Sequence, residues 1–191
     1  MSSRRGIGGI GRFLAAGLAL VSAGLQAGCF QPVYGTYASA DASVAPSIRS
    51  NLAAIQVADV NVPNGTPEAR LAVEIRNNLI FGLTGGAGQL PARYKLVMSI
   101  SAATQNVIVD ITTARSDMEI QGIDATYTLT EISTGKIVLT GRAFARASYD
   151  IPGQEQRFAR QRGQRDAENR SSAIIAEQIK SRLASYFVSG S

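Results

Sequence analysis

The sequence contains no histidine and no tryptophan, and Cys29 is its only cysteine. Without histidine the chain cannot form a Ser-His-Asp or Cys-His catalytic arrangement, and it has no imidazole ligand for zinc. A single cysteine cannot build a thiolate metal site. These absences exclude the commonest hydrolytic and zinc-dependent chemistries, so we expect a protein that is not an enzyme and that needs no metal or other cofactor.

Charge of either sign is sparse, and part of the positive excess lies at the amino terminus. The formal net charge is +5, but Arg4, Arg5 and Arg12 contribute three of the 19 basic residues. The rest of the chain is close to neutral, with a net charge of about +2. The basic isoelectric point therefore does not indicate a nucleic-acid-binding surface, and we expect no nucleic acid among the partners.

An apolar segment follows these arginines and ends directly before Cys29. Phe13 to Gly28 is shorter than the roughly 20 apolar residues of a membrane-spanning helix, and it is typical of the core of a signal peptide. We expect residues 1–28 to be removed as a lipoprotein signal and Cys29 to be acylated as the lipid anchor. The alternative is an ordinary signal peptidase site beside an unmodified thiol. Phe30, in place of an aspartate, favours sorting to the outer membrane.

The rest of the chain is organised as a tether and one domain. Residues 29–52 are rich in Ala, Ser and Pro without a sustained period, which predicts an extended tether, and residues 53–191 form the domain. Alternation predicts a first strand over 55–62, with an irregularity at Ala58-Asp59. Thr66 and Pro67 are typical of a helix start. The helix they predict, over 67–83, has an apolar stripe at Leu71, Ile75, Leu79 and Leu83.

Alternating patterns predict strands after this helix. One long strand, or two joined at Ala102-Ala103, is predicted from Tyr94 to Ile111, and residues 123–131 and 137–149 are predicted to form an antiparallel hairpin around Gly135. We expect the hairpin residues Tyr127, Leu129, Ile137 and Leu139 to pack beneath the first helix. A helical period from 152 to 189 then predicts a second helix, with an apolar stripe at Ile175, Ile179, Leu183 and Tyr186.

Several polar clusters are interpreted as structural. Acidic residues crowd one stretch, and their alternation with polar residues favours a solvated strand edge over an acid–base pair: Asp110, Asp117, Glu119 and Asp124. Gly85-Gly86-Ala87-Gly88 follows a helix and carries no Gly-Lys-Ser/Thr ending, so it indicates a helix exit rather than a phosphate loop. An arginine-rich run in the second helix indicates a solvated face or, alternatively, a cationic surface for a phosphate-bearing lipid: Arg157, Arg160, Arg162, Arg165 and Arg170.

The order of short motifs along the chain resembles the LptE family of lipopolysaccharide-assembly lipoproteins in its alphaproteobacterial form. The opening Gly28-Cys29-Phe30-Gln31-Pro32-Val33-Tyr34-Gly35 is similar to the opening of that family, with one residue fewer after the cysteine. The further matches are Arg76-Asn77-x-Leu79, Tyr94-x-Leu96, Thr113-Ala114-Arg115, Gly135-Lys136, Ser148-Tyr149, Phe158-Ala159 and Asp166-Ala167. The resemblance covers nearly the whole chain after Cys29.

The resemblance implies a two-layer α+β domain, with two helices packed on one face of a four-stranded, mostly antiparallel sheet. It also implies an outer-membrane lipoprotein in the periplasmic leaflet that plugs the LptD barrel, assists its assembly and binds lipopolysaccharide. The candidate contacts for lipid A phosphates are Arg93, Lys95, Arg115, Lys136 and Arg142. The alternative is the auxiliary lipoprotein of a phospholipid-transport ABC system of the MCE type, which would bind that complex instead of a barrel.

Overall fold

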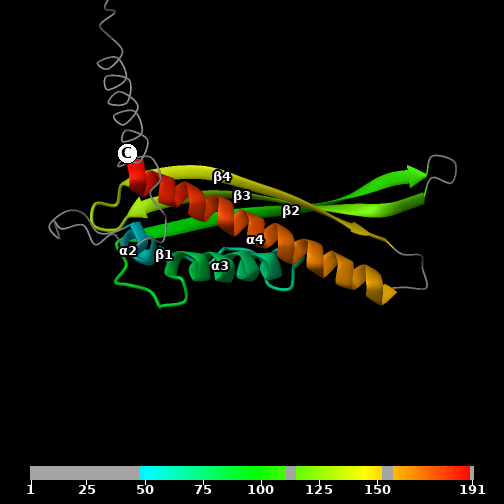
Figure 1. The fold of residues 1–191 in the computed structure, drawn as a ribbon, viewed down its shortest axis with the longest axis horizontal. Coiled ribbons are helices and arrows are strands. Elements are labelled where there is room, and N and C mark those ends of the chain that lie inside the picture. Colours follow the sequence, from blue (N-terminus) through cyan, green and yellow to red (C-terminus); the bar gives the residue numbers. More distant parts are fainter. Residues whose placement is uncertain (1–47, 111–114, 152–156, 190–191) are drawn as a thin grey trace, which may run out of the picture. The chain divides into compact units, whose positions relative to one another are not determined.

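The computed structural model describes residues 48–110, 115–151 and 157–189, except for the side chains of 108–110, 115–117 and 157. The predicted signal peptide, Cys29 and the tether up to residue 47 lie outside the described residues. The elements follow in the order α2 (Ile48–Ala53), β1 (Ile55–Val57), α3 (Pro67–Thr84), β2 (Tyr94–Asp110), β3 (Arg115–Glu131), β4 (Ile137–Asp150) and α4 (Arg157–Ser189) (Figure 1).

The four strands form one sheet in the order β1-β2-β3-β4. β1 pairs with β2 in parallel, whereas the pairs β2–β3 and β3–β4 are antiparallel. Helices α3 and α4 contact each other and pack on one face of the sheet, α3 against β1 and β2, and α4 against β3 and β4 (Figure 1). The predicted two-layer α+β fold is confirmed.

Helix α3 begins and ends where the sequence predicts. Thr66 caps its first turn, because the Thr66 hydroxyl accepts a hydrogen bond from the backbone N–H of Ala69 at 3.3 Å. Gly85 ends the helix in the left-handed conformation, φ 62°, and its N–H donates to the carbonyl of Phe81 at 2.8 Å. The Gly85–Gly88 segment is therefore a helix exit and loop, as expected. The predicted stripe Leu71, Ile75, Leu79 and Leu83 is buried.

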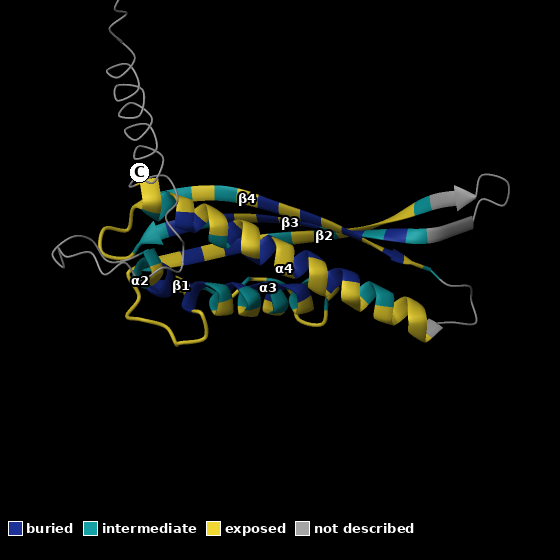
Figure 2. Ribbon diagram, viewed as in Figure 1, coloured by how far each residue is buried: buried dark blue, intermediate teal, exposed yellow. Residues whose placement is uncertain are grey.

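Strands β2 and β3 are longer than most strands, at 17 residues each, and β2 is one strand rather than two. Side chains alternate between the helix-covered face and the solvent over residues 94–103 of β2 and 119–129 of β3, which Figure 2 shows as alternating bands, whereas residues 103–106 of β2 are all exposed. Strand β3 begins at Arg115, eight residues before the predicted start at Ile123. Thr113 and Ala114, which belong to one of the motifs, lie outside the described residues.

Four expectations about local structure are wrong. β1 ends at Val57, so Val60 and Val62 do not continue it, and residues 48–53 form the short helix α2 with Leu52 buried instead of extended chain. The β3–β4 hairpin lies beneath α4, not α3. Ile137 is 60% exposed, because a register shift at the start of β4 pairs it with Thr130 and moves it off the buried face.

Helix α4 is joined to β4, the strand at the edge of the sheet. The Gln178 side chain accepts from the backbone N–H of Phe144 at 3.2 Å and donates to its carbonyl at 3.0 Å, and Arg170 donates to the carbonyl of Ser148 at 2.9 Å. Of the predicted apolar stripe of α4, Ile175, Ile179 and Leu183 are buried and Tyr186 is partly buried. These bonds occupy backbone groups that an edge strand would otherwise offer to another chain.

Candidate functional site

The face of the sheet opposite α3 and α4, which we call the open face, carries the candidate site. Cross-strand register places Val97, Thr128 and Thr140 side by side in one row of this face. Ser99, Thr126 and Arg142 form the next row. The Ser99 and Thr126 hydroxyls are 2.7 Å apart and hydrogen-bonded. The alternation of β2, β3 and β4 thus gathers hydroxyl groups and a guanidinium group on one surface.

A hollow of about 550 Å³ lies over these two rows. Its lining consists of Val97, Met98, Ser99, Thr126, Tyr127, Thr128, Thr140, Gly141 and Arg142. The outward side chains of the lining are short apart from that of Arg142. The Tyr127 ring lies against Gly141 on the covered face, where a Cβ at position 141 would be 2.4 Å from the ring. Desolvation by burial raises the pKa of Tyr127, so this phenol remains a neutral part of the core.

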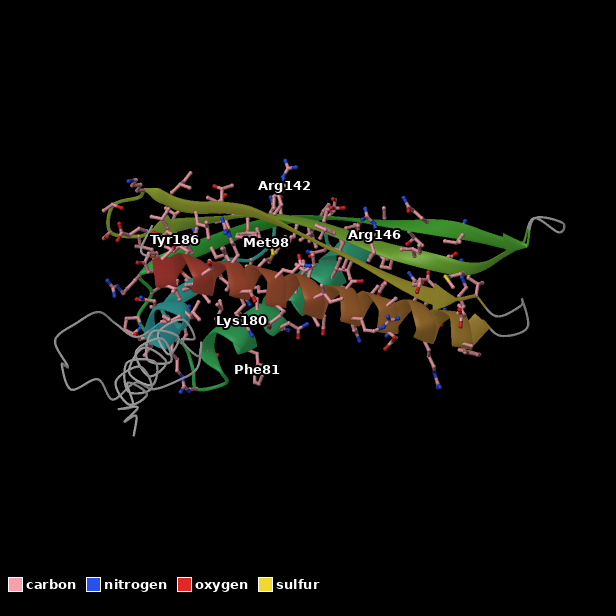
Figure 3. The ribbon with its side chains drawn as sticks, turned by 45° about the horizontal axis from the view of Figure 1, so that its top comes forward. Phe81, Met98, Arg142, Arg146, Lys180 and Tyr186 are labelled. Atoms are coloured by element: carbon pink, nitrogen blue, oxygen red, sulfur yellow. The ribbon has the colours of Figure 1, made fainter. Side chains whose placement is uncertain are left out.

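The chemistry of the hollow suits a phosphorylated or hydroxylated head group. Hydroxyls donate and accept hydrogen bonds, and a guanidinium group donates two parallel hydrogen bonds to a phosphate. Arg142 is exposed and projects away from the helices (Figure 3). No acidic residue is among those that line the hollow in the described part of the chain. An anionic ligand therefore meets donors there and no carboxylate.

The predicted cations fall into two groups. Lys95 and Arg142 lie on the open face, and Lys95 is two residues before Val97 of the hollow. Arg93 lies before β2 and Lys136 in the β3–β4 turn, and the N–H of Ile132, in the same turn, donates to the carbonyl of Arg93 at 2.9 Å. The side chain of Arg115 lies outside the described residues. Of the five candidates, the structure places Arg142 in the lining of the hollow and Lys95 on the same face, one row beyond the lining.

Arg146 is a cation of the open face that the sequence analysis missed. It is exposed on β4 opposite Gly122 of β3, and its side chain lies within 3.9 Å of where a Gly122 Cβ would be. Because Gly122 has no side chain, the aliphatic part of the Arg146 side chain can lie over the backbone of β3 at this position. The period-two spacing of Arg142, Phe144 and Arg146 is the signal that could have identified it.

Part of the arginine-rich run of α4, which is the alternative cationic surface, forms ion pairs within the domain. Arg160 donates to the carboxylate of Glu119 at 2.5 Å, and Arg170 donates to Asp166 at 2.7 Å. Arg162 and Arg165 are exposed on α4, and the side chain of Arg157 lies outside the described residues. This run is therefore partly a set of structural ion pairs and partly a solvated face.

Glu119 is not on a solvated edge, as the sequence had suggested. It is 5% exposed on the covered face, where its carboxylate accepts from the Tyr149 hydroxyl and from Arg160. Burial, the hydrogen bond to Glu119 and the charge of Glu119 raise the pKa of Tyr149 to about 12. Asp124 is exposed, as expected, and the side chains of Asp110 and Asp117 lie outside the described residues. The cluster joins β3, β4 and α4 and is structural.

A second buried carboxylate joins the two helices. Glu168 of α4 is buried and forms an ion pair with Arg70 of α3 and a hydrogen bond with Gln164 at 3.2 Å. Neither carboxylate faces the hollow. Within residues 48–110, 115–151 and 157–189, no group of three acidic, cysteine or histidine side chains is placed to hold a metal ion.

None of the described helices combines the length and the apolar character needed to cross a bilayer. The sequence matches no protein-family model, and a comparison with curated proteins also finds no match.

Solved structures share the fold. A predicted lipoprotein from Caulobacter crescentus superimposes with a TM-score of 0.61 and 22% identity, over 76% of this chain and 98% of the other. Rare lipoprotein B from Shewanella oneidensis superimposes with a TM-score of 0.50 and 14% identity, over 71% of this chain and 96% of the other. The domain therefore has a fold that occurs in bacterial lipoproteins.

Proposed function

We propose that this protein is an outer-membrane lipoprotein of the lipopolysaccharide transport machinery, anchored through Cys29 in the periplasmic leaflet. In this role it plugs an LptD-like barrel, assists its assembly and binds lipopolysaccharide. The observation that carries the proposal is the open face, where hydroxyl groups and Arg142 surround a hollow without a carboxylate. The order of LptE-like motifs and the lipoprotein fold support the same role.

Lys95, Arg142 and Arg146 supply positive charge on the open face. A phosphate group in the hollow accepts hydrogen bonds from the guanidinium group of Arg142 and from the threonine hydroxyls. We assign only the head group to the hollow, because its hydroxyls and its guanidinium group are groups that bind phosphate. The domain therefore recognises the head group and leaves the acyl chains to the membrane or to the barrel.

Lipopolysaccharide binding by the native lipoprotein tests the open face. Lys95→Glu with Arg142→Glu should weaken binding about tenfold, equivalent to one charge-assisted hydrogen bond, and the loss should shrink at high salt. Arg162→Glu with Arg165→Glu is the matched control, since it makes the same charge change on α4. Equal affinity of both double variants would contradict the assignment. Reversal at all of Arg93, Lys95, Arg115, Lys136 and Arg142 then tests the complete predicted set.

The anchor and the partner need separate measurements. Mass spectrometry of the membrane-bound protein should show an acylated Cys29 as the first residue, and Cys29→Ser should release the protein from the membrane. An unmodified cysteine in the membrane-bound form would refute the anchor. Cross-linking of the native lipoprotein followed by identification of its partner should give an outer-membrane barrel. Recovery of an MCE-type complex instead would favour the phospholipid-transport alternative.

A further inference from the structure

One end of the domain combines segments that are far apart in the sequence. The carbonyl of Ala53, at the end of α2, accepts from Leu90 at 3.0 Å, and Arg93 is bonded to Ile132 at the β3–β4 turn. The rings of Tyr94 and Phe187, near the end of α4, are 5.2 Å apart. We call this the proximal end, because α2 here is the first described element after Cys29. Figure 1 shows α2, the end of α3, the β3–β4 turn and the end of α4 together.

Exposed apolar side chains concentrate at the proximal end. Of the ten large apolar side chains that are exposed in the described ranges, five lie here: Phe81 (69%), Ile137 (60%), Val188 (52%), Ile132 (48%) and Leu90 (45%). They come from α3, the loop after it, both sides of the β3–β4 turn and the last turn of α4. Figure 3 shows Phe81 pointing away from the sheet and from α4. A concentration of exposed apolar side chains such as this one marks a site that contacts another protein or a membrane.

The charge of this end is almost entirely positive. Its segments, residues 48–57, 80–96, 130–139 and 181–189, contain the basic residues Arg49, Arg93, Lys95, Lys136 and Arg182. Their one acidic residue is Glu131, whose carboxylate accepts from the Thr134 hydroxyl in the turn at 2.7 Å. Tyr94, Tyr186 and Phe187 add aromatic rings that are partly exposed. Apolar, aromatic and basic side chains together are typical of surfaces that lie in the interface of an anionic bilayer.

We propose that the proximal end docks on a phospholipid surface with anionic head groups, with Phe81, Leu90 and Val188 in the interfacial layer and Arg49, Arg93 and Lys136 among the head groups. The inference deepens the proposed function, since it supplies the second membrane contact that an acylated Cys29 would accompany. It also divides the predicted cations, because Arg93 and Lys136 meet the bilayer while Arg142 lines the hollow and Lys95 lies between the two sites.

Docking in this way has a geometric consequence for the open face. Strands β2 and β3 begin or end at the proximal end and run away from it for 17 residues. Ser99 of the hollow is five residues beyond Tyr94, which is about 17 Å along the strand. The hollow would therefore stand above the head groups instead of within them, where it could receive a head group that has been drawn out of the membrane.

The absence of tryptophan permits a direct test with single-tryptophan variants. Phe81→Trp reports on the proximal end, and Phe158→Trp, at an 82% exposed position in the first turn of α4, is the matched control. The full-length lipoprotein is reconstituted in vesicles of phosphatidylethanolamine and phosphatidylglycerol with brominated acyl chains. We expect quenching of Phe81→Trp and little quenching of Phe158→Trp. Equal quenching of the two variants, or stronger quenching of Phe158→Trp, would overturn the inference.

Charge reversal gives an independent arm of the test. Arg93→Glu with Lys136→Glu, in the Phe81→Trp background, should lower the affinity for anionic vesicles by about fivefold or more for each cation replaced. Arg162→Glu with Arg165→Glu should leave it unchanged. Emission of Phe81→Trp that shifts to the blue with protein concentration, without lipid quenching, would mean that a second copy covers this end, and would also overturn the inference.

Failure of the anchor and failure of docking give different results. If mass spectrometry shows an unmodified Cys29, the proposal of a lipid anchor is refuted. The same unmodified protein is then added to preformed vesicles. Docking still predicts stronger quenching of Phe81→Trp than of Phe158→Trp in that experiment. If Cys29 is acylated but Phe81→Trp is not quenched, the anchor stands and docking fails.

Discussion

Removal of the Tyr149 hydroxyl tests how the buried carboxylate of Glu119 is held. In Tyr149→Phe the ring keeps its packing, but Glu119 loses the donor that faces one of its oxygens. The other oxygen keeps Arg160, which is half exposed, so its charge is partly screened by water. A hydrogen bond to a buried charged group contributes about 1.5–3 kcal/mol, and we expect the free energy of unfolding to fall by about 2 kcal/mol.

The same substitution changes how stability depends on pH. The pKa of Tyr149 is about 12, above the ordinary value of 10, so the folded state binds the phenolic proton more tightly than the unfolded state. This contribution is fully present below pH 10 and is lost as the pH rises towards 12. The difference in stability between the native protein and Tyr149→Phe should therefore shrink across that interval.

Urea denaturation followed by far-ultraviolet circular dichroism measures both effects. Tyr186→Phe is the control, because Tyr186 is only partly buried and its ring contact with Phe187 survives the change. If Tyr149→Phe unfolds at the same urea concentration as the native protein, or if its stability difference does not change between pH 10 and pH 12, the account of the Glu119 cluster is wrong.

Three further substitutions test the packing of the domain. Ile75→Ala should lower the free energy of unfolding by about 2–5 kcal/mol, because Ile75 is fully buried, and an unchanged denaturation midpoint would contradict its place in the core. Gly141→Ala should cost about 1–3 kcal/mol, because the new Cβ would meet the Tyr127 ring at 2.4 Å, and full stability would show that the ring yields freely. Gly163→Ala should stabilise α4 by up to about 1 kcal/mol in thermal unfolding, because its Cβ would reach Tyr149 at an ordinary 3.5 Å, and a loss of stability would refute this.

Local patterns were enough to predict most of the elements, but not how they meet. The capping residues of α3 and the alternation of β4 depend on neighbours in the sequence, and both predictions are confirmed. The prediction that α3 covers the β3–β4 hairpin is wrong, because α4 covers it. The apolar stripes of α3 and α4 could each pack on a sheet, and only the topology determines which strands each helix covers. The displacement of Ile137 depends on a register shift that leaves no mark in the alternation itself.

The candidate site was predictable only in part, for the same reason. Sequence reasoning named Lys95 and Arg142, but not the threonines and Ser99 that surround the hollow, because hydroxyls on three strands become neighbours only through the strand register. Glu119 was assigned to a solvated edge because its partners are 30 and 41 residues away in the sequence.

Site-specific photo-cross-linking from the open face measures whether the hollow meets lipopolysaccharide in the cell. A photoreactive residue at Thr128, in the hollow, is compared in living Gram-negative cells with one at Ile174, an exposed position of α4 outside the hollow. The account predicts a cross-link to lipopolysaccharide from position 128 and none from position 174. A folded, membrane-bound protein that gives no lipopolysaccharide cross-link at position 128, or an equal one at position 174, would contradict it.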